Sequence, residues 1–465
     1  MRLPTLGLGL SSNAQSSDSP RPWALLDADP TLFDYLEYSA PLNVDDARKE
    51  ATLFSTMESR RSATPLLYHP VHLNLWGPEL ESDERLKLLD AHARAVGSPW
   101  VSNDVGWWHH GGVPFPGYLY VSPTLDGEGL ERAVEHVLHV RNALTVPLLI
   151  ENPVVMTARG SMHIAEFMTK LHEATGCPLL LDVGHLVSHQ LARGLSLLEG
   201  LDALPWTSVA QLHLAGGVIN GKFYADDHTQ PIRDEVWTTF DEVRKRCTQL
   251  CAVTYEGDGH PESVALRTLK RLRPVIARSE VEREFPSPSE RGVGVRENQP
   301  SLWEHFRALH EEDNEELRYR LAVLADQLDA EVPLARLAVT PTLESLKAFI
   351  TSEAFENHFK TPRPLADAFL TWAAMKARTL PGADALVSLE IWARSTARTK
   401  SEATFAVDLT EALHAATALK RHLRARELIS TEAWEGLLHC ARRAPPRAWK
   451  VKLMVTARGV RISEA

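Results

Sequence analysis

Carboxylates and histidines follow a series of short apolar runs in the middle of the chain. The runs cover 147–150, 178–181, 209–212 and 252–255, and continuous apolar runs of this length are typical of buried parallel strands. Four polar residues lie directly after these runs or at their ends: Glu151, Asp182, His213 and Glu256. A nearby Asp-x-His segment adds Asp226 and His228. Oxygen and imidazole ligands without cysteine suit Fe, Mn or Zn. The sequence therefore predicts a metal site built from these side chains.

The same residues suggest what such a site could do. Carboxylates such as Glu151 and Asp226 can bridge two ions, and the i, i+2 spacing of Asp226 and His228 places both on one side of an extended chain. The candidate catalytic residues are Glu151, Asp182 and Glu256. A metal with open positions can activate water, or bind O₂ if it is Fe(II). These residues alone leave both chemistries open.

A repeating order of elements should position these side chains. Apolar strand-like runs alternate with helical segments such as Ser82–Val96 and Gly129–Ala143. The eight runs are Leu6–Leu10, Leu32–Ser39, Leu66–Leu75, Trp100–Ser102, 146–151, 178–182, 208–214 and 251–256. This alternation indicates parallel βα units, and eight of them form a (β/α)₈ TIM barrel. We therefore expect an α/β barrel over 1–278, with the polar residues at its catalytic rim.

The composition and the apolar periodicity of the sequence change after the predicted barrel. Residues 279–300 mix charge with Pro, Ser and Gly and lack periodicity, which is typical of a linker. Residues 301–465 carry apolar positions at i, i+3, i+4 spacing in segments such as Leu343–Glu356 and Thr404–Ala425. A strand is expected only near the end, within Lys450–Ile462. The prediction is a smaller, mostly helical second domain.

Composition narrows the class of protein. The chain of 465 residues has a formal net charge of −11 and no block dense in Lys or Arg, so we expect no nucleic-acid partner. No apolar run is long enough to span a membrane, and the apolar part of the N-terminus is short for a signal peptide. Four cysteines without a CxxC pair predict reduced thiols in a cytoplasmic protein.

Five motifs carry a resemblance to a known family. They are IENP at 150–153, LLLDV at 179–183, HLAGG at 213–217, D-x-H-x-x-P from 226 and E-x-D at 256–258. In order and spacing they resemble the multinuclear non-haem iron-dependent oxidases, which include the oxidase subunit of methanobactin biosynthesis. The resemblance covers about 1–275. It implies a TIM barrel with two or three irons, O₂ as oxidant, and a precursor peptide, often its cysteine, as substrate.

The resemblance also implies a set of ligands. Matching positions in this sequence are His69, Asp104, Glu151, Asp182, His213, Asp226, His228 and Glu256. Asp104 stands where the family has a histidine, and a further family histidine near Asn13 is missing. Gly184 stands at the first position of a pair that is Asn-Asn in the family, and Gly217 stands where the family has a second histidine. These departures could change the metal or its count. His109, His110 and His185 could compensate, although we expect each to have another role.

Two other functions stay open at this point. A xylose-isomerase-like barrel could use Mn or Zn for sugar isomerisation or phosphodiester hydrolysis. A degenerate barrel could instead bind a peptide without turnover, as the four departures suggest. Under the oxidase hypothesis, a separate protein binds the leader segment of the precursor peptide, or the domain at 301–465 takes that role.

Overall fold

In the computed structural model the chain folds into two compact units. One comprises Met1–His109 and Tyr120–Gln299, and the other His110–Leu119 and Pro300–Ala465. The residues that the structure describes are 1–12, 19–39, 64–116, 120–285, 315–340, 342–361, 364–379, 383, 387, 391, 401–408, 448–456 and 459–464. Among them, no helix has the length and apolar character needed to cross a bilayer.

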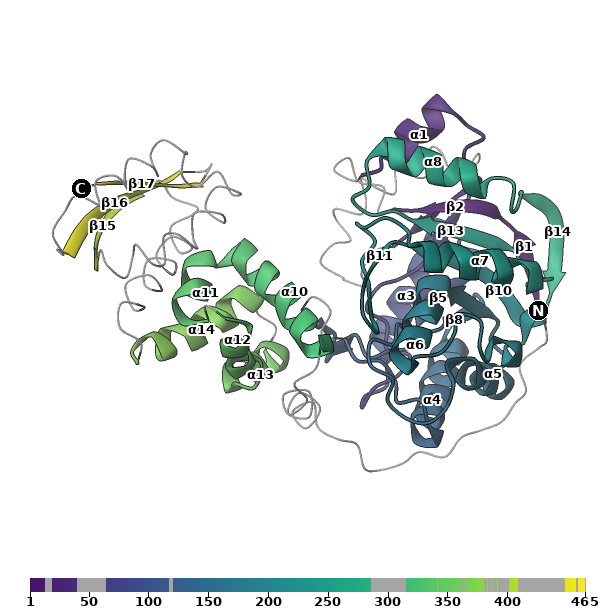
Figure 1. The fold of residues 1–465 in the computed structure, drawn as a ribbon, viewed down its shortest axis with the longest axis horizontal. Helices are drawn as coiled ribbons and strands as arrows, with labels where there is room; N and C mark the ends of the chain where they lie inside the picture. Colours follow the sequence, from purple (N-terminus) through teal and green to yellow (C-terminus); the bar gives the residue numbers. More distant parts are fainter. Residues whose placement is uncertain are drawn as a thin grey trace. The chain divides into compact units, whose positions relative to one another are not determined.

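Eight parallel strands close into a barrel in the first unit (Figure 1). In chain order they are β2 (Gly7–Ser11), β3 (Tyr35–Tyr38), β4 (Leu66–Tyr68), β5 (Val101–Asp104), β8 (Leu148–Glu151), β9 (Leu179–Asp182), β10 (Val209–Ala215) and β13 (Ala252–Glu256). The last strand pairs with the first, with Val253 opposite Leu8, so the sheet has no edge. Each strand lies within or overlaps one of the predicted runs, and the (β/α)₈ prediction is confirmed.

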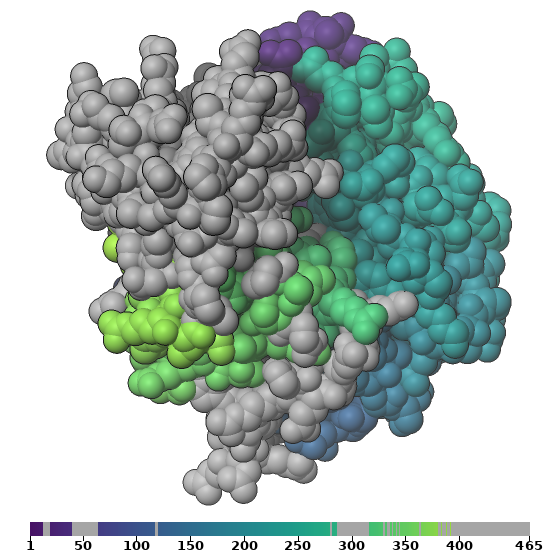
Figure 2. Space-filling view, turned by 60° about the vertical axis from the view of Figure 1, so that its left-hand side comes forward, coloured from purple at the N-terminus to yellow at the C-terminus, as the bar shows by residue number. Residues whose placement is uncertain are grey.

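Helices cover the outside of this barrel (Figure 1). The main ones are α3 (Asp83–Val96), α4 (Gly127–Ala143), α5 (Ile164–Thr175), α6 (Val183–Arg193), α7 (Asp234–Arg246) and α8 (Glu262–Leu272), with a short α1 (Pro22–Ala28) and two 3₁₀ turns at Leu201–Ala203 and Trp206–Ser208. Local signals set their ends. Ser82 caps α3 by accepting a hydrogen bond from the Arg85 amide, and Gly97 ends it with φ 67°. In Figure 2 the described residues of the barrel unit are coloured from purple through blue to teal.

A two-stranded ribbon lies at the N-terminal end of the barrel. Strand β1 (Arg2–Thr5) pairs antiparallel with β14 (Ser279–Glu284), and Leu3 and Phe285 join the buried cluster under the barrel. The first six residues of the predicted linker therefore form a strand. Their run of charges shows no apolar face, so the sequence of this segment gives no strand signal without its partner.

The chain turns away from the barrel early after β4. The predicted strand Leu66–Leu75 ends at Tyr68, because Pro70 has no N–H for the strand ladder and His72 takes a positive φ of 66°. The residues beyond form a rim loop. Two short hairpins also leave the rim: β6 (His109–His110) with β7 (Val113–Pro114), and β11 (Gly217–Asn220) with β12 (Phe223–Asp226).

The second unit contains helices, as predicted. They are α10 (Glu315–Glu331), α11 (Pro333–Val339), α12 (Leu343–Ile350), α13 (Glu353–Lys360) and α14 (Leu365–Ala377). The predicted helix Leu343–Glu356 is two helices, since the Ser352 hydroxyl accepts the Phe355 amide at 3.3 Å and starts a new one. Phe349 and Phe355 then pack with ring centroids 5.3 Å apart.

This unit also contains a three-stranded sheet. Its strands are β15 (Ser401–Asp408), β16 (Ala448–Thr456) and β17 (Gly459–Glu464). The prediction of a strand within Lys450–Ile462 is confirmed. The prediction of a helix over Thr404–Ala425 is wrong for 404–408, where antiparallel pairing with β16 prevails over a helical apolar spacing. The rest of that range lies outside the described residues.

Candidate metal centre

Acidic and imidazole side chains gather at the C-terminal ends of the barrel strands. This is where parallel strands in a closed barrel point their last residues toward one place. The residues are Glu37 on β3, His69 directly after β4, Asp104 at the end of β5, Glu151 at the end of β8, Asp182 at the end of β9, His213 on β10 and Glu256 at the end of β13. All except Asp104, which is partly exposed, are buried.

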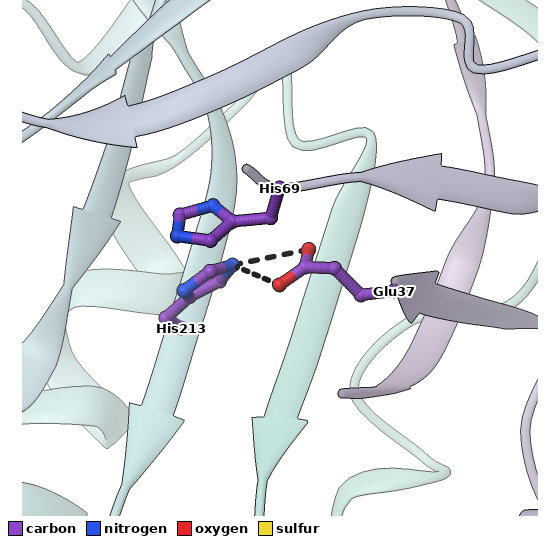
Figure 3. Close-up of side chains that lie close together, drawn as sticks. All are labelled: Glu37, His69 and His213. Atoms are coloured by element: carbon purple, nitrogen blue, oxygen red, sulfur yellow. Dashed lines mark hydrogen bonds and ion pairs between the residues drawn. The ribbon is translucent and has the colours of Figure 1, made fainter. Parts of the chain in front are cut away.

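Glu37, His69 and His213 form one group of close side chains (Figure 3). The His213 Nε2 lies 3.0 Å from Glu37 Oε1, and the two imidazole rings are 5.3 Å apart at their centroids. The Nδ1 of His69 contacts the Ser102 hydroxyl at 3.0 Å, so its Nε2 faces Glu151 Oε2 at 3.8 Å. One ligand atom from each of the three residues lies within 4.8 Å of the others, a spacing that one ion could span.

Glu151 joins two further groups. It belongs to Asp104–Glu151–His185 and to Glu151–Asp182–His213, each with ligand atoms within 4.8 Å of one another. Its Oε1 is 3.5 Å from His213 Nδ1 and 4.0 Å from His185 Nδ1. Among the carboxylates of the described residues, Glu151 is therefore the one whose position would allow it to be shared between two ions.

The first turn of α6 brings in His185. Asp182 caps this helix by accepting the His185 amide at 2.8 Å, and the Asn152 side chain braces both the amide and the carbonyl of Asp182. The His185 Nδ1 lies 2.8 Å from the carbonyl oxygen of Asn152. A hydrogen on Nδ1 leaves the Nε2 lone pair facing Asp226 at 3.4 Å, the orientation that metal-binding histidines commonly have.

The hairpin after β10 completes the rim. Asp226 ends β12, which packs against α6, and its Oδ2 is 3.1 Å from His228 Nε2. The same nitrogen is 4.0 Å from Glu256 Oε2, and His228 Nδ1 is 3.1 Å from Asp258. Asp226 and His228 thus approach from a hairpin and the loop beyond it, and not from the end of a barrel strand.

The pKa shifts reflect how closely these buried charges lie. Burial raises the pKa of Asp182 to about 7, and the nearby Asp226 carboxylate adds to that rise although His185 opposes it. Burial disfavours the charged form of His213, but the carboxylates of Glu37 and Glu256 outweigh it and raise its pKa well above the ordinary range. Such a concentration of buried negative charge calls for cations or protons to balance it.

Several buried polar atoms of the cluster have no hydrogen bond within the described part of the chain. They are Glu37 Oε1, Glu151 Oε2, Asp182 Oδ2 and His213 Nδ1, all buried. A buried polar atom without a partner costs about 1–3 kcal/mol, so a set of them facing each other fits a bound ion. Carboxylate oxygens and neutral imidazoles without thiolates suit iron, manganese or zinc. The donor set therefore fits a multinuclear metal centre.

The predicted ligands are found together, and two residues join them. All eight positions predicted from the sequence lie in this cluster, linked through contacts such as His185 Nδ1 to Asp104 at 3.8 Å. Glu37 lies within the predicted strand Leu32–Ser39 but was not among the predicted ligands, and His185 was expected to have another role. His109 is bound to Glu81 at 2.8 Å, outside the cluster, and His110 belongs to the second unit. Asn13 lies outside the described residues.

One aromatic side chain accounts for two of the departures from the family pattern. A Cβ on Gly217 would overlap the Tyr224 ring, and one on Gly184 would lie 2.6 Å from its hydroxyl oxygen. Tyr224 itself is fully buried. Its ring therefore fills the space that side chains at both glycine positions would need.

Fold and site together define the class of protein. A closed parallel barrel with buried carboxylates and imidazoles along its catalytic rim is the arrangement of a TIM-barrel enzyme. The chain belongs to the family of RiPP precursor modification enzymes MbnB/TglH/ChrH, whose family model matches residues 9–271. RiPPs are ribosomally made peptides that enzymes then modify, so the family acts on peptide precursors.

Curated relatives and solved structures are similar to the barrel part of the chain. A UPF0276 protein of Streptomyces avermitilis is 28% identical over 238 residues, 48% of this chain and 48% of that protein. One of Vibrio vulnificus is 31% identical over 186 residues, 38% of this chain and 63% of that protein. The chain thus spans less than two thirds of the length of these relatives.

Among solved structures, a xylose isomerase domain protein of Salmonella typhimurium has a TM-score of 0.40 and 12% identity, over 59% of this chain and 98% of its own. Endonuclease IV of Thermus thermophilus has a TM-score of 0.37 and 18% identity, over 57% and 98%.

Proposed function

We propose that the chain is a multinuclear iron-dependent oxidase that uses O₂ to modify a residue, cysteine or similar, of a RiPP precursor peptide. The observation that carries the proposal is the rim cluster: among the described residues, six carboxylates and four imidazoles approach one another there without a thiolate. Membership of the peptide-modifying family supports a precursor peptide as the substrate. The proposed cofactor is iron, two or three ions per chain.

The proposed ligands divide the work of holding these ions. They are His69, Asp104, Glu151, Asp182, His213, Asp226, His228 and Glu256, now with His185. Glu151 would bridge two ions, since it belongs to two of the candidate groups. Asp182 also fixes the first turn of α6, which orients His185 toward the cluster. Bound iron would supply open positions for O₂ and for a side chain of the peptide.

The peptide substrate must also be held while one of its residues reaches the rim. A cytoplasmic precursor would reach the rim with its leader segment held elsewhere. Either a separate protein holds the leader, or residues 301–465 do so as a fused partner domain. The two competing functions, an isomerase or hydrolase using Mn or Zn and a peptide-binding barrel without turnover, differ from the proposal in the metal they need.

Metal analysis of matched variants tests the proposal. The full chain is loaded anaerobically with Fe(II), freed of excess metal, and its iron measured by mass spectrometry. We expect two or three irons in the unaltered chain and fewer in Glu151→Ala and His213→Ala. Glu81→Gln is the control, because Glu81 is a buried carboxylate bound to a histidine outside the cluster. Unchanged iron in both ligand variants would remove these residues from the centre, and retention of only Zn or Mn would favour the isomerase or hydrolase.

A further inference from the structure

His213 faces carboxylates with both of its ring nitrogens. Its Nδ1 lies 3.3 Å from Glu256 Oε2 and 3.5 Å from Glu151 Oε1. Its Nε2 lies 3.0 Å and 3.2 Å from the two oxygens of Glu37 (Figure 3). A neutral imidazole has one N–H and one lone pair, so one of these sides holds the hydrogen and the other can hold an ion.

A series of hydrogen bonds that begins at Trp100 shows which groups donate and which accept around Glu37. The Trp100 indole can only donate, and its Nε1 lies 2.9 Å from Gln211 Oε1, so the amide NH₂ of Gln211 points the other way. That NH₂ reaches Glu37 Oε2 at 2.6 Å and Thr254 Oγ1 at 3.0 Å. Thr254 in turn donates to Glu37 Oε2 at 2.9 Å and contacts the Tyr35 hydroxyl at 2.7 Å. Glu37 Oε2 therefore accepts hydrogen bonds from the Gln211 amide and from the Thr254 hydroxyl.

The His213 ring fits the same pattern. Its Nε2 makes a hydrogen bond to Glu37 Oε2, so the carboxylate lies along the direction in which Nε2 would bind an ion. The Gln211 amide nitrogen is also 2.9 Å from Nε2, but both of its hydrogens already have oxygen acceptors. Nε2 therefore carries the hydrogen. Nδ1, buried and without a hydrogen bond in the described chain, is left facing Glu151 and Glu256.

We propose that Glu37 is a positioning residue for the metal centre and not one of its ligands. It accepts the Nε2–H of His213, fixes the tautomer and the ring plane, and so presents Nδ1 to an ion shared with Glu151 and Glu256. A carboxylate behind a ligand histidine also makes the imidazole a stronger donor. The inference rests on the proposed metal centre. It assigns the contact between Glu37 and His213 to the support of an ion. His69 stays a proposed ligand, through the Nε2 that faces Glu151.

Titration of the full chain with Co²⁺ alone tests this role. We expect Glu37→Gln to keep the number of Co²⁺ ions per chain and to weaken the affinity about 10–100-fold, the usual effect of losing such a partner. The matched control is Glu81→Gln, which removes a buried carboxylate from another histidine and should leave the Co²⁺ affinity unchanged. Loss of one ion in Glu37→Gln would make Glu37 a ligand, and unchanged affinity would remove its role. Either result overturns the inference.

A spectroscopic measurement on the unaltered chain avoids any variant that fails to fold. In the chain loaded with Zn²⁺, two-bond ¹H–¹⁵N spectra should show His213 with its hydrogen on Nε2 and the metal on Nδ1. The peaks are assigned by their loss in His213→Gln. The opposite pattern, or no binding of Co²⁺ or Zn²⁺ at all, would overturn the inference. Failure of O₂-dependent peptide oxidation with this pattern intact would contradict the proposed function alone.

Discussion

Tyr224 distinguishes the rim at the scale of single residues. Its ring lies against both Gly184 and Gly217, and its hydroxyl contacts the Gly216 carbonyl at 3.4 Å. The phenol thus fills a space next to Asp182 and Asp226. Its burial raises the pKa of Tyr224 well above the ordinary range, and the charges of Asp226 and Asp182 add to that rise. A neutral hydroxyl in this position leaves the carboxylates as the charged groups on this side of the cluster.

We therefore expect Gly217→Ala to lower the free energy of unfolding by about 1–3 kcal/mol, because the added methyl overlaps the Tyr224 ring. Chemical denaturation measures this loss. Gly127→Ala is the control, since a Cβ there meets nothing within 4 Å. In a Tyr224→Ala background, the effect of Gly217→Ala should disappear. An equal loss in both backgrounds would mean that Tyr224 does not fill the space.

A pH dependence is expected from buried neutral histidines. Burial lowers the pKa of His136 on α4 from 6.5 to about 4, so the folded state prefers the neutral ring. Protonation then favours unfolding. The stabilisation is complete above pH 6.5 and is lost as the pH falls toward 4, at most about 3 kcal/mol at about 1.4 kcal/mol per pKa unit.

Replacing this histidine should flatten that loss. Denaturation of the full chain at pH 7.5, 6 and 5 should show a smaller decrease for His136→Gln than for the unaltered protein. His72 and His189 have pKa values lowered in the same direction, to about 4, so part of the decrease should persist. An identical pH profile for the variant would contradict a neutral, buried His136.

The ligand residues that end strands could be predicted from the sequence, but Glu37 and His185 beside them could not. A polar residue that closes an apolar run is visible as a break in the pattern, as at Asp182. Glu37 lies inside its strand, where a single inward carboxylate looks like any alternating position. His185 follows Asp182 by one helical turn, and only the cap geometry shows that its ring returns to the cluster. The i, i+3 spacing of Asp182 and His185 was the available signal.

The ribbon under the barrel is the feature that matters at the scale of elements. It holds the N-terminus to Ser279–Glu284, and Phe285 packs into the cluster below the strands with 3% exposure. Elements with local apolar periods, the barrel strands and helices, were predictable. The strands β14 and β15 were not, because each is defined by its partner strand at a distance in sequence.

Removing the Phe285 ring should open the lower end of the barrel. We expect Phe285→Ala to destabilise the chain by about 3–5 kcal/mol in chemical denaturation, the usual cost of deleting a buried phenylalanine. Val281→Ala, in the same ribbon with 52% exposure, should change stability by less than about 0.5 kcal/mol. Equal effects of the two substitutions would show that the ribbon does not close the barrel.

At the scale of the whole molecule, one unit carries the candidate centre and the other carries a helical group with a small sheet. Every residue of the cluster belongs to the barrel unit, so the chemistry is expected from that unit. The role of 301–465 as a leader-binding partner stays a prediction. It can be examined only with a peptide, which makes peptide modification by the full chain the decisive observation.

Oxidation of a precursor peptide by iron at this rim can be measured directly. The full chain is loaded anaerobically with Fe(II), mixed with the peptide encoded by the nearest short reading frame beside its gene, and exposed to air. We expect an O₂-dependent change in the mass of the peptide, abolished in Glu151→Ala and kept in Glu81→Gln. An unchanged peptide mass despite full iron loading would contradict it and favour a barrel that binds peptide without turnover.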